Sequence, residues 1–490
     1  MRVKYHTLEA ESDEEDAMDE SLPAMNRRKS NDNYDMRKVA SLQVSPTSGD
    51  ENNAGPAALQ HHPETLPDHE HVPYRLYRRR YIGLAQLVLL NIVISWDWLT
   101  FAPISTTSAS FFAVSESAIN WLSTAFQFAF LPISPLAGPN TPSSSPPPSS
   151  WPGNWIRYAG TRVTDPTGHG NFPLVMLGQI LIGFAQPFVL AAPTRYSNLW
   201  FSDRGRVSAT TLASLANPFG AALGQLIGPL WATSEAGIPD MVLYTSLLSA
   251  AATLPAPFIP RAPPTPPSAI AASEKLDLRA ALHELPRNRA FWLLFVAFSV
   301  YVGFFNAVSS LLNQIFAPYG FSETDAGIAG GLLILVGLVA AAFVSPFVDR
   351  TKKYVITIKI LVPLIASSYL VLIFVPATRS AVGIYVVCAV LGAASFSLLP
   401  CALEYLVVVT HPVSPEITST ICWSGGQLLG AVFIVIMTAL RGGWTGEPEG
   451  TMMRALIFQA VVAWAAVPFP MMLGLWWFKG DVERVAGEEG

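Results

Sequence analysis

Residues 290–316, AFWLLFVAFSVYVGFFNAVSSLLNQIF, run for 27 residues without one charged side chain. A helix of about 20 apolar residues crosses the hydrocarbon core of a bilayer, so this stretch predicts a transmembrane helix. A transmembrane strand needs only about ten residues and alternates in polarity, which this stretch does not. The sequence therefore predicts an all-α protein built from membrane-spanning helices.

Ten further stretches satisfy the same rule, which makes about eleven recognisable spans. Five come before a polar stretch, and they lie near 82–104, 118–137, 173–199, 207–231 and 239–259. Six come after it, near 290–316, 325–348, 354–376, 381–408, 417–440 and 452–478. We therefore expect an N-terminal transmembrane half over 74–259 and a C-terminal transmembrane half over 290–478, joined by a central cytoplasmic loop at 260–289.

The composition favours a membrane protein over a soluble enzyme. Hydrophobic residues make up 51% of the chain and charged residues 13%, whereas a soluble domain carries about 25% charged residues. Residues 1–73 hold 15 acidic and 7 basic residues, so we expect a disordered acidic cytoplasmic tail there, and a second cytoplasmic tail at 479–490. Nucleic acid is disfavoured as a partner because phosphate binding needs a clustered basic surface.

The basic residues between the spans predict the orientation and show that one crossing is missing. Lys and Arg gather on the cytoplasmic side of membrane proteins. Basic clusters lie at 75–80, 204–206, 261–289 and 350–353. If all of these and both termini are cytoplasmic, an even number of crossings must precede Arg204, but only three spans do.

The missing crossing falls in residues 138–172, which begin GPNTPSSSPPPSS and continue with few apolar residues. Backbone polar groups in lipid must be hydrogen-bonded within the segment, so a Pro/Ser tract cannot replace a helix. One interpretation is a true loop that breaks the charge rule. The other, which we favour because it agrees with every basic loop, is that most of a helix has been lost by deletion or by a wrongly joined coding sequence. Residues 154–158 are then its remainder.

Six helices, a basic loop and six more helices is the plan of transporters with two similar halves and a substrate site between them near the midplane. The chain after the span at 325–348 reads PFVDRTKK (346–353). This string resembles the second-half copy of the Gly-x-x-x-Asp-Arg-x-x-Arg/Lys loop of the major facilitator superfamily. The first-half copy would fall in the absent segment.

Further short strings carry a narrower resemblance over nearly the whole membrane part. They are WLTFAP (98–103), INWLS (119–123), GQILIGFAQPF (178–188), NLWFSDRGR (198–206), ANPFGAALG (216–224), APPTPPS (262–268), SSLLNQ (309–314) and GGQLLG (425–430). Together with PFVDRTKK they resemble the feline leukaemia virus subgroup C receptor-related transporters, and most closely the orphan major-facilitator-domain branch of that family. The resemblance implies facilitated movement of a small organic solute. In that family the cargo is choline or ethanolamine, haem has been proposed for some members, and the orphan branch has no agreed cargo.

The same resemblance implies a substrate pocket. Trp98 corresponds to a tryptophan that contacts the choline head group, and indole attracts a quaternary ammonium through cation–π interaction. Gln186 and Gln427 correspond to pocket glutamines, and Phe298 corresponds to a pocket tyrosine whose hydroxyl this chain lacks. The alternatives are packing against a neighbouring helix for Trp98 and interhelical hydrogen bonds for the two amides.

Asp97 is the one acid in the first predicted span, where a charge costs at least about 2.5–3.5 kcal/mol to insert. Neighbouring residues on a helix point about 100° apart, so Asp97 and Trp98 are able to border one wide cavity. Asp97 is therefore a candidate charge complement for a cationic substrate, or a site for a coupling proton. The alternative is a carboxyl group that is hydrogen-bonded to a neighbouring helix. Relatives carry an uncharged residue here, so the resemblance does not support the role.

Three other charged residues are candidates for coupling or gating. Glu404 follows Pro400, a residue type that kinks helices, and a structural hydrogen bond is its alternative role. Asp349 and Arg350 are candidates for a cytoplasmic latch between the halves, with helix-end capping as the alternative. The sequence shows no phosphate loop, no metal-ligand spacing and no nucleophile–base pair, so we expect no catalysis, no metal and no cofactor.

These observations favour a monomeric, multi-pass transporter of a small-molecule substrate, in the plasma membrane or an endomembrane of the cell. The substrate would be a cationic or zwitterionic amine such as choline, or haem, moved by alternating access, and a proton is a candidate coupling ion. Two alternatives stay open, namely a non-transporting membrane receptor or scaffold and a non-functional product of a defective gene.

Overall fold

The computed structural model describes residues 76–137, 150–164, 168–256, 262–265, 285–410, 413, 415–442 and 448–474. Within these residues the secondary structure is helical, apart from an isolated bridge between Thr164 and Gly170. The predicted all-α fold is thus confirmed. The predicted tails at 1–73 and 479–490 and most of the predicted loop at 260–289 lie outside the described residues.

Each of the eleven predicted spans corresponds to a helix. The first set, which we call the N half, comprises α1 (Arg79–Trp98), α2 (Ser105–Phe112), α3 (Glu116–Ile133), η1 (Ser134–Ala137), α4 (Ser150–Arg162), α5 (Phe172–Trp200), α6 (Asp203–Trp231), η2 (Glu235–Gly237) and α7 (Ile238–Thr253). The second set, the C half, comprises η4 (Leu285–Arg287), α10 (Arg289–Phe316), η5 (Ala317–Tyr319), α11 (Glu323–Thr351), α12 (Tyr354–Leu372), η6 (Pro376–Thr378), α13 (Ala381–Thr410), α14 (Pro415–Ala439), α15 (Met453–Ala466) and α16 (Pro468–Met471). Among the described helices, eight are long and apolar enough to cross a membrane.

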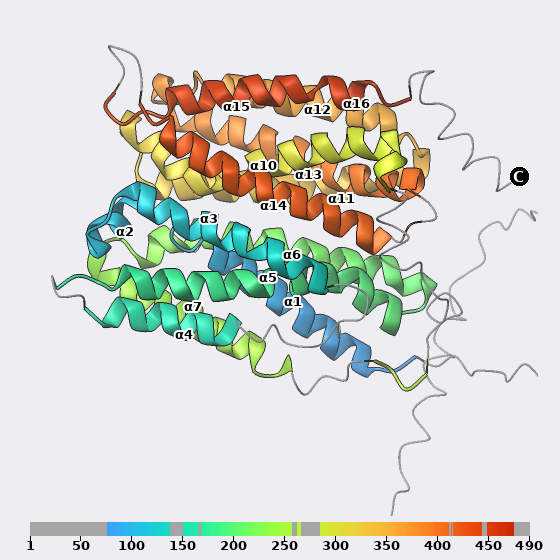
Figure 1. Cartoon of the computed structure of the whole chain (residues 1–490), viewed down its shortest axis with the longest axis horizontal. Helices are drawn as coiled ribbons and strands as arrows, with labels where there is room; N and C mark the ends of the chain where they lie inside the picture. Colours follow the sequence, from blue (N-terminus) through green and yellow to red (C-terminus); the bar gives the residue numbers. More distant parts are fainter. Residues whose placement is uncertain are drawn as a thin grey trace, which may run out of the picture. The chain divides into compact units, whose positions relative to one another are not determined.

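Two pairs of long helices join the halves. Helix α3 packs along α14, and the two run side by side in Figure 1. Helix α6 packs along α11. We call the end of the bundle where α2 lies, and where α1 and α10 end, the α2 end.

Proline sets two helix ends that the hydropathy pattern placed too late. The first span was expected to continue to 104, but α1 ends at Trp98. A proline ring clashes with the carbonyl of the residue four positions earlier, so Pro103 disfavours a helix that continues through Leu99, although α3, α5 and α6 each contain internal prolines. In the last span, Pro468 and Pro470 lie where α15 gives way to the short α16.

Helix α4 lies in the segment where the sequence analysis found a crossing missing. The loop interpretation is wrong for residues 150–162, because they form a helix of 13 residues. At 1.5 Å per residue α4 is about 20 Å long, whereas the hydrocarbon core is about 30 Å thick. The helix is therefore present but shortened, and with α1, α3 and α5 it gives an even number of crossings before Arg204. Residues 138–149 and 165–167 lie outside the described residues.

Small residues let α4 approach α5 closely. A Cβ added at Gly153 would lie 2.8 Å from the carbonyl oxygen of Gly178, and a Cβ at Gly178 would lie 2.8 Å from the backbone nitrogen of Arg157. Both distances are too short for a real Cβ, so glycine is required on each helix. Close backbone approach through small residues is the usual means by which transmembrane helices associate.

We expect Gly178→Ala to lower the stability of the protein by about 1–3 kcal/mol, because the added methyl overpacks the α4–α5 contact. Thermal unfolding of the purified protein in detergent measures this. Gly383→Ala in α13 is the matched control, because its added Cβ would lie 3.3 Å from the nearest atom, a Val375 side-chain carbon that can yield. Equal melting temperatures for the two variants would contradict the close contact.

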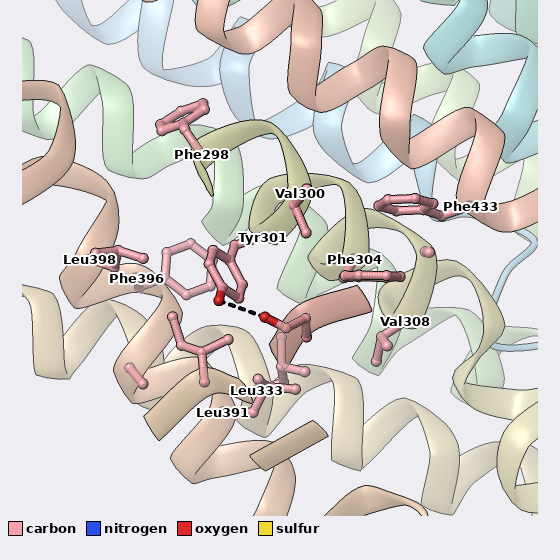
Figure 2. Packing of buried hydrophobic residues seen from close by; sticks show 14 of the residues in the cluster. Phe298, Val300, Tyr301, Phe304, Val308, Leu333, Leu391, Phe396, Leu398 and Phe433 are labelled. Atoms are coloured by element: carbon pink, nitrogen blue, oxygen red, sulfur yellow. Dashed lines mark hydrogen bonds between the residues drawn. The ribbon is translucent and has the colours of Figure 1, made fainter. Parts of the chain in front are cut away.

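The largest apolar cluster fills the C half and extends into the N half. Phe304 of α10 stacks on Phe433 of α14 with ring centroids 4.1 Å apart, and Figure 2 shows both rings beside Tyr301 and Val308. The Tyr301 hydroxyl donates a hydrogen bond to the Ala463 carbonyl of α15, 2.9 Å away. Trp98, Phe126 and Ile182 from the N half belong to the same cluster. This apolar packing is the frame in which the few buried polar groups are held.

Candidate functional site

A buried ion pair lies inside the N half. Arg157 of α4 and Asp97 of α1 are 0% and 1% exposed, and Arg157 Nη2 lies 3.0 Å from Asp97 Oδ1. Asn154, one turn before Arg157, donates through Nδ2 to the second Asp97 oxygen at 2.6 Å. Arg157 Nη1 donates to Gln179 Oε1 of α5 at 2.8 Å. Buried charges are tolerated when they are paired and hydrogen-bonded in this way.

The same arginine closes the end of α1. Arg157 Nη1 and Gln179 Nε2 donate to the backbone carbonyl of Asp97, at 3.0 and 3.1 Å. The last carbonyls of a helix lack partners within the helix and carry its negative dipole end, so a cation and an amide stabilise them. Arg157 and Gln179 therefore stabilise the last turn of α1, which ends at Trp98.

The Asp97 carboxylate is bonded to a neighbouring helix, α4, which is the alternative role considered for it in the sequence analysis. Its charge is matched by Arg157 within the N half. The guanidinium also lies 5.6 Å from the centroid of the Phe101 ring. A cargo cation would therefore have to displace Arg157 to use Asp97, and we do not include Asp97 among the cargo contacts proposed below.

The predicted aromatic residues form one ring pair in each half. Trp98 stacks on Phe126 of α3, with ring centroids 6.5 Å apart and planes 19° apart. Its indole nitrogen has no hydrogen-bond partner within the described residues. Phe298 of α10 meets Trp423 of α14 edge to face at 5.6 Å. The predicted aromatic residues Trp98 and Phe298 are thus each paired with a second ring, Phe126 or Trp423, that the sequence did not single out.

The predicted amides lie on α5 and α14. Gln427 Oε1 accepts a hydrogen bond from Asn306 Nδ2 of α10 at 3.3 Å. Gln186 is 4% exposed, and its Oε1 has no partner in the part of the chain that the structure describes. Gln427 and Asn306 are therefore held together within the C half, whereas Gln186 keeps a free acceptor.

The coupling and gating candidates lie on α13 and α11. Glu404 is exposed on α13, in the turn after Pro400. Asp349 and Arg350 belong to the last turn of α11, and Arg350 is exposed. The side chain of Asp349 is outside the described set. The roles proposed for these three residues stay predictions.

The α2 end carries a latch between the halves that the sequence did not reveal. Helix α2 has no side-chain cap of its own. Instead, Glu323 of α11 accepts the backbone N–H of Thr107 at 2.9 Å and its hydroxyl at 2.7 Å. Asn313 Nδ2 donates to the side-chain oxygens of Ser105 and Thr106, both at 3.0 Å. A carboxylate satisfies the orphan N–H groups at a helix N-terminus, so the C half caps a helix of the N half.

Two further contacts close the same end. Glu116, in the first turn of α3, forms an ion pair with Arg441, which follows α14. Asn120 Nδ2 donates to Gln314 Oε1 at 3.1 Å and to Thr438 Oγ1 at 2.9 Å. The described structure is therefore closed between the halves at the α2 end.

No group of three or more metal-type ligands occurs among the residues that the structure describes. The polar contacts between the halves are made by amides, hydroxyls, the Glu323 carboxylate and the Glu116–Arg441 ion pair.

The comparison with protein families decides the class of this chain. Residues 87–416 match the sequence model of the Major Facilitator Superfamily. The chain belongs to the major facilitator superfamily. It is accordingly an integral multi-pass membrane transporter and not an enzyme, as the sequence predicted.

Relatives within the superfamily confirm the narrower resemblance. Solute carrier family 49 member A3 of Danio rerio is 34% identical and matches 75% of this chain and 80% of its own length. The choline/ethanolamine transporter FLVCR1 of Felis catus is 25% identical and matches 84% of this chain and 78% of its own length. This major facilitator chain is therefore related to both the orphan branch and the choline/ethanolamine branch.

Solved structures share the fold. A bacterial homologue of the human lysosomal transporter Spinster, in an inward-facing and occupied conformation, aligns with a TM-score of 0.59 at 13% identity. The alignment covers 81% of this chain and 97% of that one. The nucleoside transporter NupG aligns with a TM-score of 0.58 at 12% identity, over 80% of this chain and all of NupG. At these identities the likeness shows the major facilitator fold alone.

Proposed function

We propose that this transporter carries a small cationic or zwitterionic amine across the membrane by alternating access. The observation that carries the proposal is one aromatic pair in each half, Trp98 with Phe126 and Phe298 with Trp423, packed in one cluster that spans both halves. Gln427, Asn306 and Gln186 supply amides. The two relatives described above support an amine cargo, because one of them is named a choline/ethanolamine transporter.

The chemistry of the site fits an ammonium group without a fixed counter-charge. The face of an indole or phenyl ring attracts a cation with about 0.5–2 kcal/mol, more when water is excluded. A carboxylate at the site would bind the cation more tightly and slow its release. The only buried acid near Trp98 in the described part of the chain is Asp97, and Arg157 already neutralises it.

The cycle requires the α2 end to open and close. Basic residues gather at the opposite end of the bundle, at Arg78–Arg80, Arg287, Arg289, Arg350, Lys352 and Lys353, and Lys and Arg mark the cytoplasmic side. We therefore place the α2 end on the non-cytoplasmic side and both termini in the cytoplasm. The latch of Glu323, Asn313 and Glu116 then belongs to a state that is closed to the outside.

We expect Glu323→Gln to shift the population toward a state that is open at the α2 end. The amide keeps one acceptor oxygen where the carboxylate offers two, and it loses the negative charge at the α2 N-terminus, together about 1–2 kcal/mol. This corresponds to about tenfold faster modification of a cysteine at position 310 by a membrane-impermeant maleimide. Ser310 is 3% exposed and lies one turn before Gln314, on the face of α10 that meets the N half. The three native cysteines are replaced by alanine for this measurement.

Asp325→Asn is the matched control for the latch. Asp325 lies on the same helical turn as Glu323, but its carboxylate accepts from Ser322 and Tyr385, both within the C half. The control variant should leave the labelling rate unchanged. Equal acceleration in both variants would mean that Glu323 does not hold the two halves together.

Counterflow in liposomes tests the transport function itself. Purified protein is reconstituted with unlabelled choline or ethanolamine inside, and uptake of the labelled compound is followed. We expect saturable exchange that depends on the internal amine. Stable binding of an amine by the purified protein without exchange would favour the receptor alternative. Exchange of haem without exchange of amines would show that the cargo is haem.

A further inference from the structure

The seam between α3 and α14 carries polar residues at a regular spacing. Asn120, Gln127 and Ser134 are seven residues apart, which places them on one face along α3 and the turn that follows it. At the α2 end of the seam, Asn120 donates to Thr438 of α14 at 2.9 Å. At the opposite end, Ser134 accepts from Ser424 of α14 at 3.0 Å. The outer two of the three positions are therefore closed by hydrogen bonds between the halves.

The middle position forms no side-chain hydrogen bond across the described part of the seam. Gln127 is 0% exposed, and neither its Oε1 nor its Nε2 has a hydrogen-bond partner within the described residues. Across the seam it faces Gly430, where an added Cβ would overlap Gln127 Oε1 and would lie 3.1 Å from Asn306 Nδ2. The Gln127 amide thus occupies the space that glycine leaves at position 430, and Asn306, which bonds Gln427, lies beside it.

Location distinguishes this glutamine from an ordinary packing defect. Gln459 of α15 is equally buried with both amide atoms unpartnered, but it lies in the interior of the C half. Gln127 lies between the halves, and its neighbour Phe126 carries the ring on which Trp98 stacks. A buried amide without partners is costly, so its retention at a substrate interface indicates a ligand that completes it.

We infer that Gln127 is a specificity residue whose amide binds a hydroxyl group of the cargo. The inference rests on the proposed function and deepens it. The rings bind the ammonium end of the amine, and Gln127 binds the opposite end. A hydroxyl both donates and accepts, so it satisfies Gln127 Oε1 with its proton while its oxygen receives an amide proton from Gln127 or Asn306. The ammonium end of the same molecule then faces Trp98. An alkyl end of equal size leaves the amide unpartnered, so Gln127 selects amines that carry a hydroxyl group.

The test compares amines that differ only in the hydroxyl. Choline is paired with ethyltrimethylammonium, and ethanolamine is paired with ethylamine. Two readouts are taken on purified full-length protein, thermal stabilisation in detergent and competition for counterflow in liposomes. We expect the wild type to prefer each amino alcohol about tenfold or more over its deoxy partner, since a site built to bond a hydroxyl rejects an analogue without one.

Gln127→Leu should reduce that preference to near unity while uptake of the deoxy compounds is kept. Gly430→Ala is the second variant, because its methyl displaces the Gln127 amide and leaves the residue in place, and it should reduce the preference as well. Gln459→Leu is the matched control, which removes an equally buried amide and should keep the wild-type ratio.

The two proposals fail in different ways. If the wild type exchanges amines and Gln127→Leu keeps the full hydroxyl preference, the inference about Gln127 is wrong and the transport function stands. If amino alcohols stabilise the wild type but not Gln127→Leu, and no exchange occurs, the inference stands and transport fails. If no amine of the panel stabilises the protein or exchanges, both are overturned.

Discussion

Replacing Arg157 by methionine is expected to lower the free energy of unfolding by about 3–5 kcal/mol, because it leaves a buried carboxylate without its counter-charge. Asp97 is 1% exposed, and its remaining partner is the Asn154 amide. The substitution also removes one of the two donors to the Asp97 carbonyl at the end of α1. Thermal unfolding in detergent and the yield of membrane-inserted protein measure the loss.

The double variant Asp97→Asn with Arg157→Met separates charge from packing. It removes both charges and retains a polar group for Asn154, so it should recover at least half of the stability lost in the single variant. Neutralised pairs are often as stable as the ion pair that they replace, whereas a broken pair is not. A double variant as unstable as Arg157→Met would show that the arginine acts through its packing alone.

Trp98→Ala is expected to abolish saturable uptake of choline and ethanolamine, with an affinity loss of about 100-fold or more. The loss combines a desolvated cation–π contact of about 2 kcal/mol with the apolar contact of the ring, and each 1.4 kcal/mol corresponds to a factor of ten. Trp98→Phe keeps an aromatic face and should retain part of the affinity. Initial rates of counterflow over a concentration series measure the effect.

Trp96 provides the matched control on the same helix. It is as buried as Trp98, with both side chains 7% exposed, but it stacks on Trp231 of α6 within the N half. Trp96→Ala should therefore cost stability without changing the apparent affinity for either amine. Unchanged kinetics in Trp98→Ala, or the same affinity loss in both variants, would remove Trp98 from the cargo site.

Hydropathy predicted the helices well, because a long apolar run has few alternatives in lipid. The eleven spans were all found, and the errors lay at ends where proline acts, as at Pro103 and Pro468. Helix α4 escaped the same rule because it is short and polar. Glycine contacts hold it against α5 and the Arg157–Asp97 ion pair holds it against α1. Neither interaction requires a long run of apolar residues.

Residues of the candidate site could be predicted only where a short sequence motif resembles the family. Trp98, Phe298, Gln186 and Gln427 could be named from the resemblance, but no sequence pattern shows that Asp97 meets a residue 60 positions later. The latch around Glu323 is likewise a contact between distant segments. Gln127 did leave a signal, the seven-residue spacing from Asn120 to Ser134 along one apolar span. A search for such spacing within predicted spans would have found it.

Because α4 is short, the stability of this protein should depend on the thickness of the bilayer. The described helix α4 is about 10 Å shorter than the hydrocarbon core is thick, and the sequence directly before it, 139–149, consists only of Pro, Asn, Thr and Ser and adds no apolar side chain. Lipids answer such hydrophobic mismatch by thinning locally, and the strain is smaller in a thin membrane than in a thick, sterol-rich one. Annular lipids around α4 should therefore be compressed, and the chain should be at its most stable in bilayers of short acyl chains.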